Sequence, residues 1–351
     1  MATAADRITR LALRNADAIA RSALYPPAID ALIEGRALLA EQRRLAETVA
    51  TVACGRTSTW RRRRRKELAE RRVLDPARAA TADVPAVWWH EDGSADAPAI
   101  LLLNGWTASG LMWPGELVDR LAREHRVLRV DNRGTGWSRT VPGAVTMRAM
   151  ADDAADVLRA GATGPAIVVG LSMGGMIAQE LTLRHPGLVA GLVLTATRPP
   201  APAHVQASPA VLRMVTAEPA AGASRAATVG RMWAALCGPG FVEEHPELVE
   251  ELVGQVRRRV TPAAAVNAQM LAIAAWSGAD RLCEITVPTT VVHGDHDRLL
   301  PVGNGMRLSR LIPGAEYVEV PGVGHLVPME APDALVDAVR QTGKVARITT
   351  V

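Results

Sequence analysis

The segment from Ile167 to Gln179, which reads IVVGLSMGGMIAQ, constrains the fold of this chain more than any other. An apolar run of strand length leads into a turn that contains Ser172, and an apolar helix-like pattern follows at once. Such a sharp turn predicts a positive φ for Ser172, a strained conformation that is rarely kept without a use. Gly170 and Gly174 would let the strand and helix approach without Cβ clashes. We therefore predict a nucleophilic serine beside the positive end of a helix.

The sequence around this segment predicts an α/β fold with a mostly parallel sheet and helices on both of its faces. From Val84 onward, apolar stretches of strand length alternate with amphipathic stretches of helical period. Repeated strand–helix alternation is typical of parallel sheets covered on both sides. The predicted strands are Ala86–His90, Ala99–Leu103, Arg126–Val130, Ile167–Val169, Leu192–Thr195, Thr289–His293 and Tyr317–Val320. The predicted helices between them include Glu116–Arg123, Met147–Ala160 and Met173–Arg184.

A proline-rich stretch at Arg198–Pro202 interrupts this alternation, and only helical patterns follow it for about 80 residues. These patterns cover Ala210–Val215, Ser224–Leu236, Pro246–Arg259 and Pro262–Trp276. Ligands of α/β folds bind at the carboxyl ends of strands, where insertions form lids. We therefore predict a core formed by residues 84–198 and 284–351, with residues 199–283 as a helical cap over the site.

The first 83 residues form a basic extension with helical patterns. They hold 17 Lys+Arg and 10 Asp+Glu, a balance of +7, whereas the remaining chain holds 23 and 26, a balance of −3. The run Arg61–Lys66 consists of six cations, which we interpret as a solvated helix face, with an anionic surface or an acidic patch on a partner as the alternative. Nucleic acid is disfavoured because Trp60 is the one aromatic residue beside the run. We expect this segment to pack on the body or on a partner protomer, which leaves a homo-oligomer open.

The remaining composition indicates a cytoplasmic protein without a transmembrane segment. No apolar run approaches the ~18 residues of a membrane span, and charged residues interrupt the apolar pattern of the N-terminus, unlike in a secretory signal. Cys54, Cys237 and Cys283 are odd in number and far apart, so they predict neither a disulfide framework nor a metal pair. We expect a reduced compartment and no cofactor.

A nucleophilic serine needs a base that takes its proton and an acid that orients the base, in the chain order serine, acid, histidine for this kind of turn. Of the candidate bases, we favour His325 over His293 and His296. His325 follows every candidate acid in the chain and lies in a glycine-rich loop after the last predicted strand. A histidine with a purely structural hydrogen bond is the alternative.

The candidate acids lie in the stretch HGDHD, which follows an apolar strand. We favour Asp297 over Asp295 because Pro301 can begin the next helix, which leaves Asp295 to form the turn. The same stretch contains metal-ligand residue types. Neighbouring side chains on a strand alternate in direction, however, and no matching cluster lies elsewhere, so we predict no metal site.

Two backbone N–H groups should form an oxyanion hole. The residue after the nucleophile, Met173, would provide one, and Trp106 in the loop after Ala99–Leu103 the other, with Gly105 permitting the turn. Substrate contacts are expected from Asn104, Gly105, Trp137, Trp233 and Trp276. Tryptophans that only pack the cap onto the core are the alternative, which is compatible with an aromatic-lined pocket.

Four motifs in this order resemble those of the α/β-hydrolase family, from Ala86 to Arg340 with the cap as an interruption. They are LLLNGWTASGLMW, DNRGTGWS at Asp131–Ser138, GLSMGG, and HGDHDRLLP with PGVGHLVP. The pattern is most similar to capped esterases and lactonases, including methylesterases of polyketide tailoring. One departure is Asn104, where most of the family has histidine.

The resemblance implies a serine hydrolase that cleaves a carboxylic ester, lactone or thioester of a small to medium apolar substrate through an acyl-enzyme on Ser172. Two alternatives use the same triad: a cofactor-free perhydrolase (haloperoxidase-like) and a C–C bond hydrolase. A third is a non-catalytic binding protein that acts through its basic N-terminal arm.

Overall fold

A computed structural model describes residues 85–139, 141, 143–217, 228, 232–233, 235–247, 250, 254, 256 and 260–349 of the 351-residue chain. The chain separates into two units, Met1–Ala82 and Asp83–Val351, and all described residues belong to the second. The predicted N-terminal extension therefore lies outside the described residues, as do most of the predicted helices Ser224–Leu236 and Pro246–Arg259.

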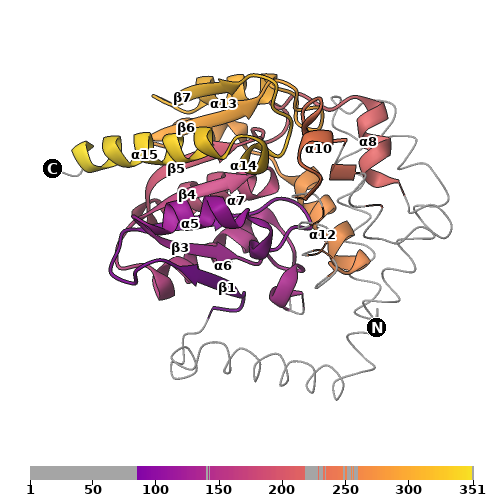
Figure 1. Ribbon diagram of the computed structural model, residues 1–351. Helices are drawn as coiled ribbons and strands as arrows, with labels where there is room; N and C mark the ends of the chain where they lie inside the picture. The colour runs from indigo at the N-terminus through magenta and orange to yellow at the C-terminus, as the bar shows by residue number, and fades with distance from the viewer. Residues whose placement is uncertain are drawn as a thin grey trace, which may run out of the picture. The chain divides into compact units, whose positions relative to one another are not determined.

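The second unit contains a seven-stranded sheet with the order β1-β3-β2-β4-β5-β6-β7 (Figure 1). β1 is antiparallel to β3, and every other neighbouring pair is parallel. The strands are β1 Trp89–Asp92, β2 Ala99–Leu103, β3 Arg126–Val130, β4 Ala166–Leu171, β5 Val189–Thr195, β6 Thr289–Gly294 and β7 Glu316–Val320. The predicted fold class, a mostly parallel sheet with helices on both faces, is confirmed.

Helices cover the two faces of this sheet in separate layers. Along β2 the buried side chains alternate, because successive residues of a strand point to opposite faces. Leu101 and Leu103 pack in one core cluster with α6, α7 and α13, whereas Ile100 and Leu102 pack in a second with α5 and α15. The helices of the core are α5 Gly115–Ala122, α6 Met147–Gly161, α7 Met173–Arg184, α13 Gly303–Leu311, α14 Val327–Glu330 and α15 Pro332–Thr349.

The first strand begins later than the apolar pattern predicts. The sequence predicts Ala86–His90, whereas β1 runs from Trp89 to Asp92 in register with β3. At Trp88 the carbonyl still accepts from the N–H of Asp131 at 2.9 Å, but the N–H donates to the hydroxyl of Ser138 at 2.7 Å. Local hydrophobicity does not reveal this long-range contact.

An insertion, residues 199–283, lies between β5 and β6 and contains α8 Pro209–Thr216, α10 Phe241–Glu244, α12 Ala263–Ala275 and the 3-10 helix η5 Ala279–Glu284. Figure 1 shows α8, α10 and α12 together on one side of the sheet. A small apolar cluster joins Trp233 and Cys237 of the insertion to Met112 after β2 and to Leu326 after β7. The insertion is thereby packed onto loops that follow core strands. None of the described helices combines the length and apolar character needed to cross a membrane.

Candidate active site

Ser172 lies between β4 and α7, with φ 56° and ψ −118°. The positive φ predicted from the sharp turn is confirmed. Two contacts with the end of β5 hold this strained backbone. The N–H of Ser172 donates to the carbonyl of Thr195 at 3.0 Å, and its carbonyl accepts from the hydroxyl of Thr197 at 2.7 Å. The turn presents the serine side chain at the positive end of α7.

The glycines around Ser172 permit contacts between backbones. A Cβ on Gly170 would lie 2.5 Å from the carbonyl oxygen of Gly174, and a Cβ on Gly174 would lie 1.9 Å from that of Leu103. Carbon and oxygen cannot approach this closely. Gly170 thus lets β4 and α7 approach, as predicted, whereas Gly174 permits the close approach of α7 to the end of β2.

His325 and Asp297 form a buried pair. The Nδ1 of His325 lies 2.7 Å from Oδ2 of Asp297, and the two side chains are at most 5% exposed. The other carboxylate oxygen accepts from the backbone N–H groups of Leu299 and Leu300, at 2.9 and 2.8 Å. A carboxylate held on both oxygens has a fixed orientation, so it can fix the ring of His325.

The rival residues occupy different environments. Near the surface, Oδ1 of Asp295 lies 2.7 Å from Nδ1 of His296 and also accepts from the N–H of Gly322. His293 is fully buried, with Nε2 2.7 Å from the carbonyl oxygen of Leu300 and 3.3 Å from Oδ2 of Asp297. His293 therefore contacts the acid, a supporting position that the sequence reasoning did not assign to it.

The environment of Asp297 favours its charged form. Burial alone would raise the pKa of this carboxyl, but the charge of His325 and the hydrogen bonds from His293 and His325 outweigh burial and lower the pKa to about 2. A carboxylate that stays ionised can stabilise a positively charged imidazole during a reaction.

This lowered pKa predicts a loss of stability in acid. Since the folded pKa of about 2 lies below the ordinary 3.8, the contribution is complete above about pH 5 and is lost as the pH falls through 3.8 toward 2. Between pH 5 and pH 3 the free energy of unfolding should fall by about 1 kcal/mol more in the wild type than in Asp297→Asn. Urea unfolding at both pH values measures the difference. Equal acid losses in the two proteins would contradict it.

The loop after β2 carries the predicted oxyanion donor. The N–H of Gly105 donates to Oδ1 of Asn104 at 2.7 Å, that of Thr107 to Oε1 of Gln269 at 3.0 Å, and that of Ala108 to the carbonyl of Gly105 at 3.2 Å. In the described part of the chain, the N–H of Trp106 makes no such hydrogen bond. Met173 is the first residue of α7, where backbone N–H groups have no partner within the helix. Both N–H groups are therefore available for the predicted role.

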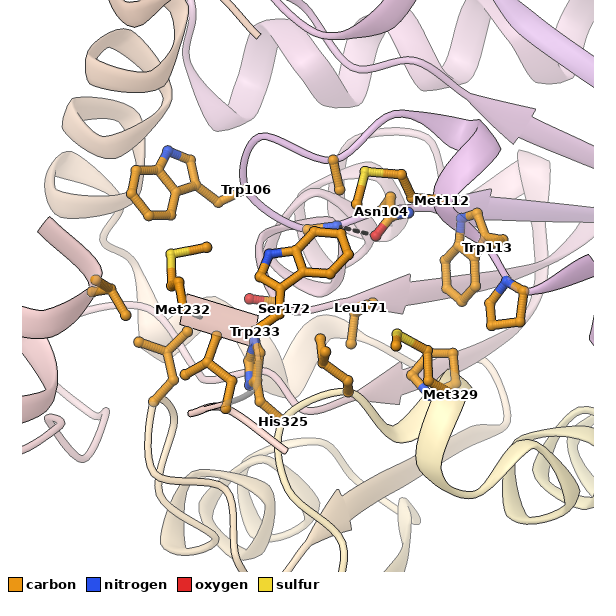
Figure 2. Close-up of a pocket in the computed structure, with 18 residues that line it drawn as sticks. Asn104, Trp106, Met112, Trp113, Leu171, Ser172, Met232, Trp233, His325 and Met329 are labelled. Atoms are coloured by element: carbon orange, nitrogen blue, oxygen red, sulfur yellow. Dashed lines mark hydrogen bonds between the residues drawn. The ribbon is translucent and has the colours of Figure 1, made fainter. Parts of the chain in front are cut away.

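The side chain of Asn104 forms hydrogen bonds to two other residues of this loop. Its amide nitrogen donates to the carbonyl of Ser109 at 3.0 Å while its oxygen accepts from Gly105, and its own carbonyl accepts from Asn132 at 3.0 Å. The side chain that departs from the family pattern therefore supplies hydrogen bonds that shape the loop. Figure 2 shows the bond between Asn104 and Gly105 as a dashed line.

Ser172 and His325 line one pocket, together with apolar side chains from the core and the insertion. In Figure 2 they lie in the middle, with Trp106 and Met232 on the left and Trp113 and Met329 on the right. The pocket is lined by Asn104, Gly105, Trp106, Ala108, Met112, Trp113, Pro114, Leu171, Ser172, Val215, Met232, Trp233, Leu236, Leu299, His325, Leu326, Pro328 and Met329. Within the described part of the chain, this lining contains no Asp, Glu, Lys or Arg. The pocket suits an uncharged apolar ligand.

Three of the five residues predicted to contact substrate, Asn104, Gly105 and Trp233, line this pocket, whereas Trp137 and Trp276 are not among its lining residues. The Trp137 ring packs against Trp88, with centroids 6.1 Å apart. Trp276 is buried, and its indole N–H donates to Glu180 at 3.4 Å. Their contacts are with the core, as in the packing alternative.

Glu330 was not singled out by its sequence context, but its carboxylate binds the loop that carries His325. One oxygen accepts from the N–H groups of Gly324 and Gly238, at 2.9 and 2.6 Å, and the other from that of Leu326 at 2.9 Å. The N–H of His325 itself donates to the carbonyl of Leu236 at 2.7 Å. The insertion thus contacts the loop directly, through Leu236 and Gly238.

Comparisons with known proteins show what this chain is similar to. The sequence profile of the family described as "alpha/beta hydrolase fold" matches residues 98–332. The chain is 28% identical over 290 residues to rhodomycin D methylesterase of Streptomyces sp. (strain C5), covering 75% of this chain and 97% of that protein. It is 29% identical over 247 residues to a non-heme haloperoxidase of Rhodococcus erythropolis, covering 68% and 88%. The structure is similar to a thermophilic esterase from Thermogutta terrifontis, with a TM-score of 0.61 and 29% identity over 74% of this chain and 93% of that one.

Proposed function

Because the chain belongs to the α/β-hydrolase fold family, we propose that it cleaves carboxylic esters of small to medium apolar substrates through an acyl-enzyme on Ser172. The observation that carries the proposal is a shared pocket. The strained Ser172 and His325 line it from loops after different strands, and the buried Asp297 contacts His325 from behind. Esterase and methylesterase relatives support an ester as the substrate.

In the proposed mechanism, the Asp297 carboxylate accepts a hydrogen bond from the Nδ1–H of His325. Nε2 therefore carries the lone pair that receives the proton of Ser172. The serine oxygen attacks the ester carbonyl, and the N–H groups of Trp106 and Met173 stabilise the oxyanion. His325 then gives its proton to the leaving alcohol. A water molecule, activated in the same way, releases the acid and restores Ser172.

The insertion, residues 199–283, acts in this proposal as the cap that selects the substrate. Its side chains Val215, Met232, Trp233 and Leu236 form part of the lining. Because they are apolar, the acyl or alcohol part of the substrate is expected to be uncharged, and lactones and thioesters of this kind fit the same chemistry.

A second candidate function, perhydrolysis, is favoured by the similarity to the non-heme haloperoxidase. Hydrogen peroxide would replace water at the acyl-enzyme and release a peracid. Comparing peracid formation from acetate and hydrogen peroxide with the turnover of simple esters separates the two. Peracid formation faster than turnover of every ester in an acyl-chain panel would favour the second function.

Covalent labelling tests the nucleophile. A fluorophosphonate probe is expected to add one adduct per chain, located at Ser172 by peptide mass mapping, because this serine lies beside a base and an oxyanion hole. Ser172→Ala should remain unlabelled. An adduct on another residue, or a wild-type protein that is inert to the probe, would refute the assignment.

A further inference from the structure

We propose that Gln269, a residue of the insertion, positions the oxyanion-stabilising N–H of Trp106. The inference rests on the proposed function. It adds that the core loop holds its catalytic geometry only with the insertion bound to it, so Gln269 acts through Trp106 and is a positioning residue that itself touches no substrate.

Three hydrogen bonds join the insertion to Trp106 and Thr107. The side-chain oxygen of Gln269 accepts from the N–H of Thr107 at 3.0 Å, and the hydroxyl of Thr261 donates to the carbonyl of Thr107 at 2.8 Å. The indole N–H of Trp106 donates to the carbonyl of Val266 at 2.9 Å. Both backbone polar groups of Thr107 and the side chain of Trp106 are thus bound by one segment.

Thr107 needs such support because its φ is 64°, a left-handed conformation that is unfavourable for a residue with a branched Cβ. A strained residue of this kind typically costs on the order of 1–3 kcal/mol and persists only where its surroundings hold it. The N–H of Thr107 belongs to the peptide unit that joins it to Trp106. The Trp106 N–H lies on the preceding peptide unit, so relaxation at Thr107 would displace it through the backbone of Trp106.

Gln269 is well suited to hold this geometry. It is fully buried, and its amide nitrogen donates to the carbonyl of Arg133 at 2.7 Å, in the loop after β3. Its side chain is therefore anchored to a second core loop while it fixes the first. On the other side, Asn104 already binds the N–H of Gly105. Trp106 therefore lies between two residues whose N–H groups are held, Gly105 by Asn104 of the core and Thr107 by Gln269 of the insertion.

Oxyanion donors act over a narrow range of distance, about 2.7–3.1 Å. A misplacement of about 1 Å can reduce the rate by roughly 100-fold. Removing the hydrogen bond between Gln269 and Thr107 should therefore weaken binding of the transition state much more than binding of the substrate.

The test replaces Gln269 by methionine, which has a similar length and lacks both hydrogen-bonding groups. For an aryl ester, kcat is expected to fall about 10- to 100-fold with KM changed less than about 3-fold. The inhibition constant of a trifluoromethyl ketone, whose adduct carries the oxyanion, should rise in parallel with the loss of kcat/KM. A role in stability alone would not produce this parallel.

The matched control is Asn304→Leu. Asn304 is also a fully buried amide that joins the core to the insertion by two backbone hydrogen bonds, to the N–H and carbonyl of Val205, at 2.7 and 2.8 Å. It is absent from the pocket lining and from the contacts of the oxyanion loop. Its replacement should lower stability while kcat stays within about 3-fold of the wild type.

If Gln269→Met does not fold, Thr261→Val is the second variant, because it removes another hydrogen bond to Thr107. It should lower kcat about 3- to 10-fold while KM again changes less than about 3-fold. Unchanged kcat in the folded variant, or equal losses of kcat in Gln269→Met and Asn304→Leu, would overturn the inference. Failure of the proposed function is distinguishable, because the wild type would then resist both the ketone and the fluorophosphonate.

Discussion

Replacing Ser172 by alanine is expected to lower kcat for ester hydrolysis by roughly 10⁵- to 10⁶-fold while the fold stays intact. The loss is large because the acyl-enzyme needs this oxygen, and neither His325 nor the oxyanion hole can supply a covalent bond. Residual activity of about 10³-fold over water would come from the remaining groups. Steady-state turnover of a panel of aryl esters with different acyl chains measures the effect.

The melting temperature of Ser172→Ala shows whether a loss of activity comes from the missing hydroxyl or from unfolding. Alanine keeps the Cβ of serine and suffers the same strain at φ 56°, so the melting temperature should change by only about 2 °C. Ser309→Ala is the matched control. This hydroxyl bonds to the carbonyl of Met306 within α13, at 3.0 Å, and lies outside the pocket lining. If Ser172→Ala hydrolysed the panel as well as Ser309→Ala does, Ser172 would not be the nucleophile.

Features encoded by neighbouring residues could be predicted from the sequence. The positive φ of Ser172 follows from a strand, a glycine-flanked serine and a helix within 13 residues. The preference for Asp297 over Asp295 followed from a local rule about Pro301. The structure shows why these two aspartates differ, since Asp297 is buried against His325 and Asp295 pairs with His296 near the surface.

Features that depend on contacts between distant segments could not be predicted. Gln269 binds Thr107 and Glu330 binds Gly238 across separations of 162 and 92 residues, and neither side chain stands out in its own helix. The same limit explains the placement of Trp276. Its position near the end of a predicted cap helix suggested a pocket wall, whereas the fold turns it toward Glu180.

The second large effect concerns the fold that presents Ser172. Gly174→Ala is expected to lower the free energy of unfolding by about 4 kcal/mol or to abolish folding. The new Cβ would lie 1.9 Å from the carbonyl oxygen of Leu103 and 2.8 Å from that of Asn104. Both oxygens belong to backbone at the end of β2, which cannot rotate away as a side chain can. Relief requires α7 to separate from β2, with loss of contacts in the buried core.

Gly187→Ala is the matched control, because a Cβ at Gly187 meets no atom within 4 Å. Its free energy of unfolding should stay within about 0.5 kcal/mol of the wild type. Thermal and urea unfolding of both variants measure the contrast. Any folded Gly174→Ala should also lose activity, because displacement of β2 moves the Asn104–Thr107 loop and the oxyanion donor proposed there. Equal free energies of unfolding in the two variants would show that α7 and β2 can separate at little cost. The fold would then not require the close approach of α7 and β2 that presents Ser172.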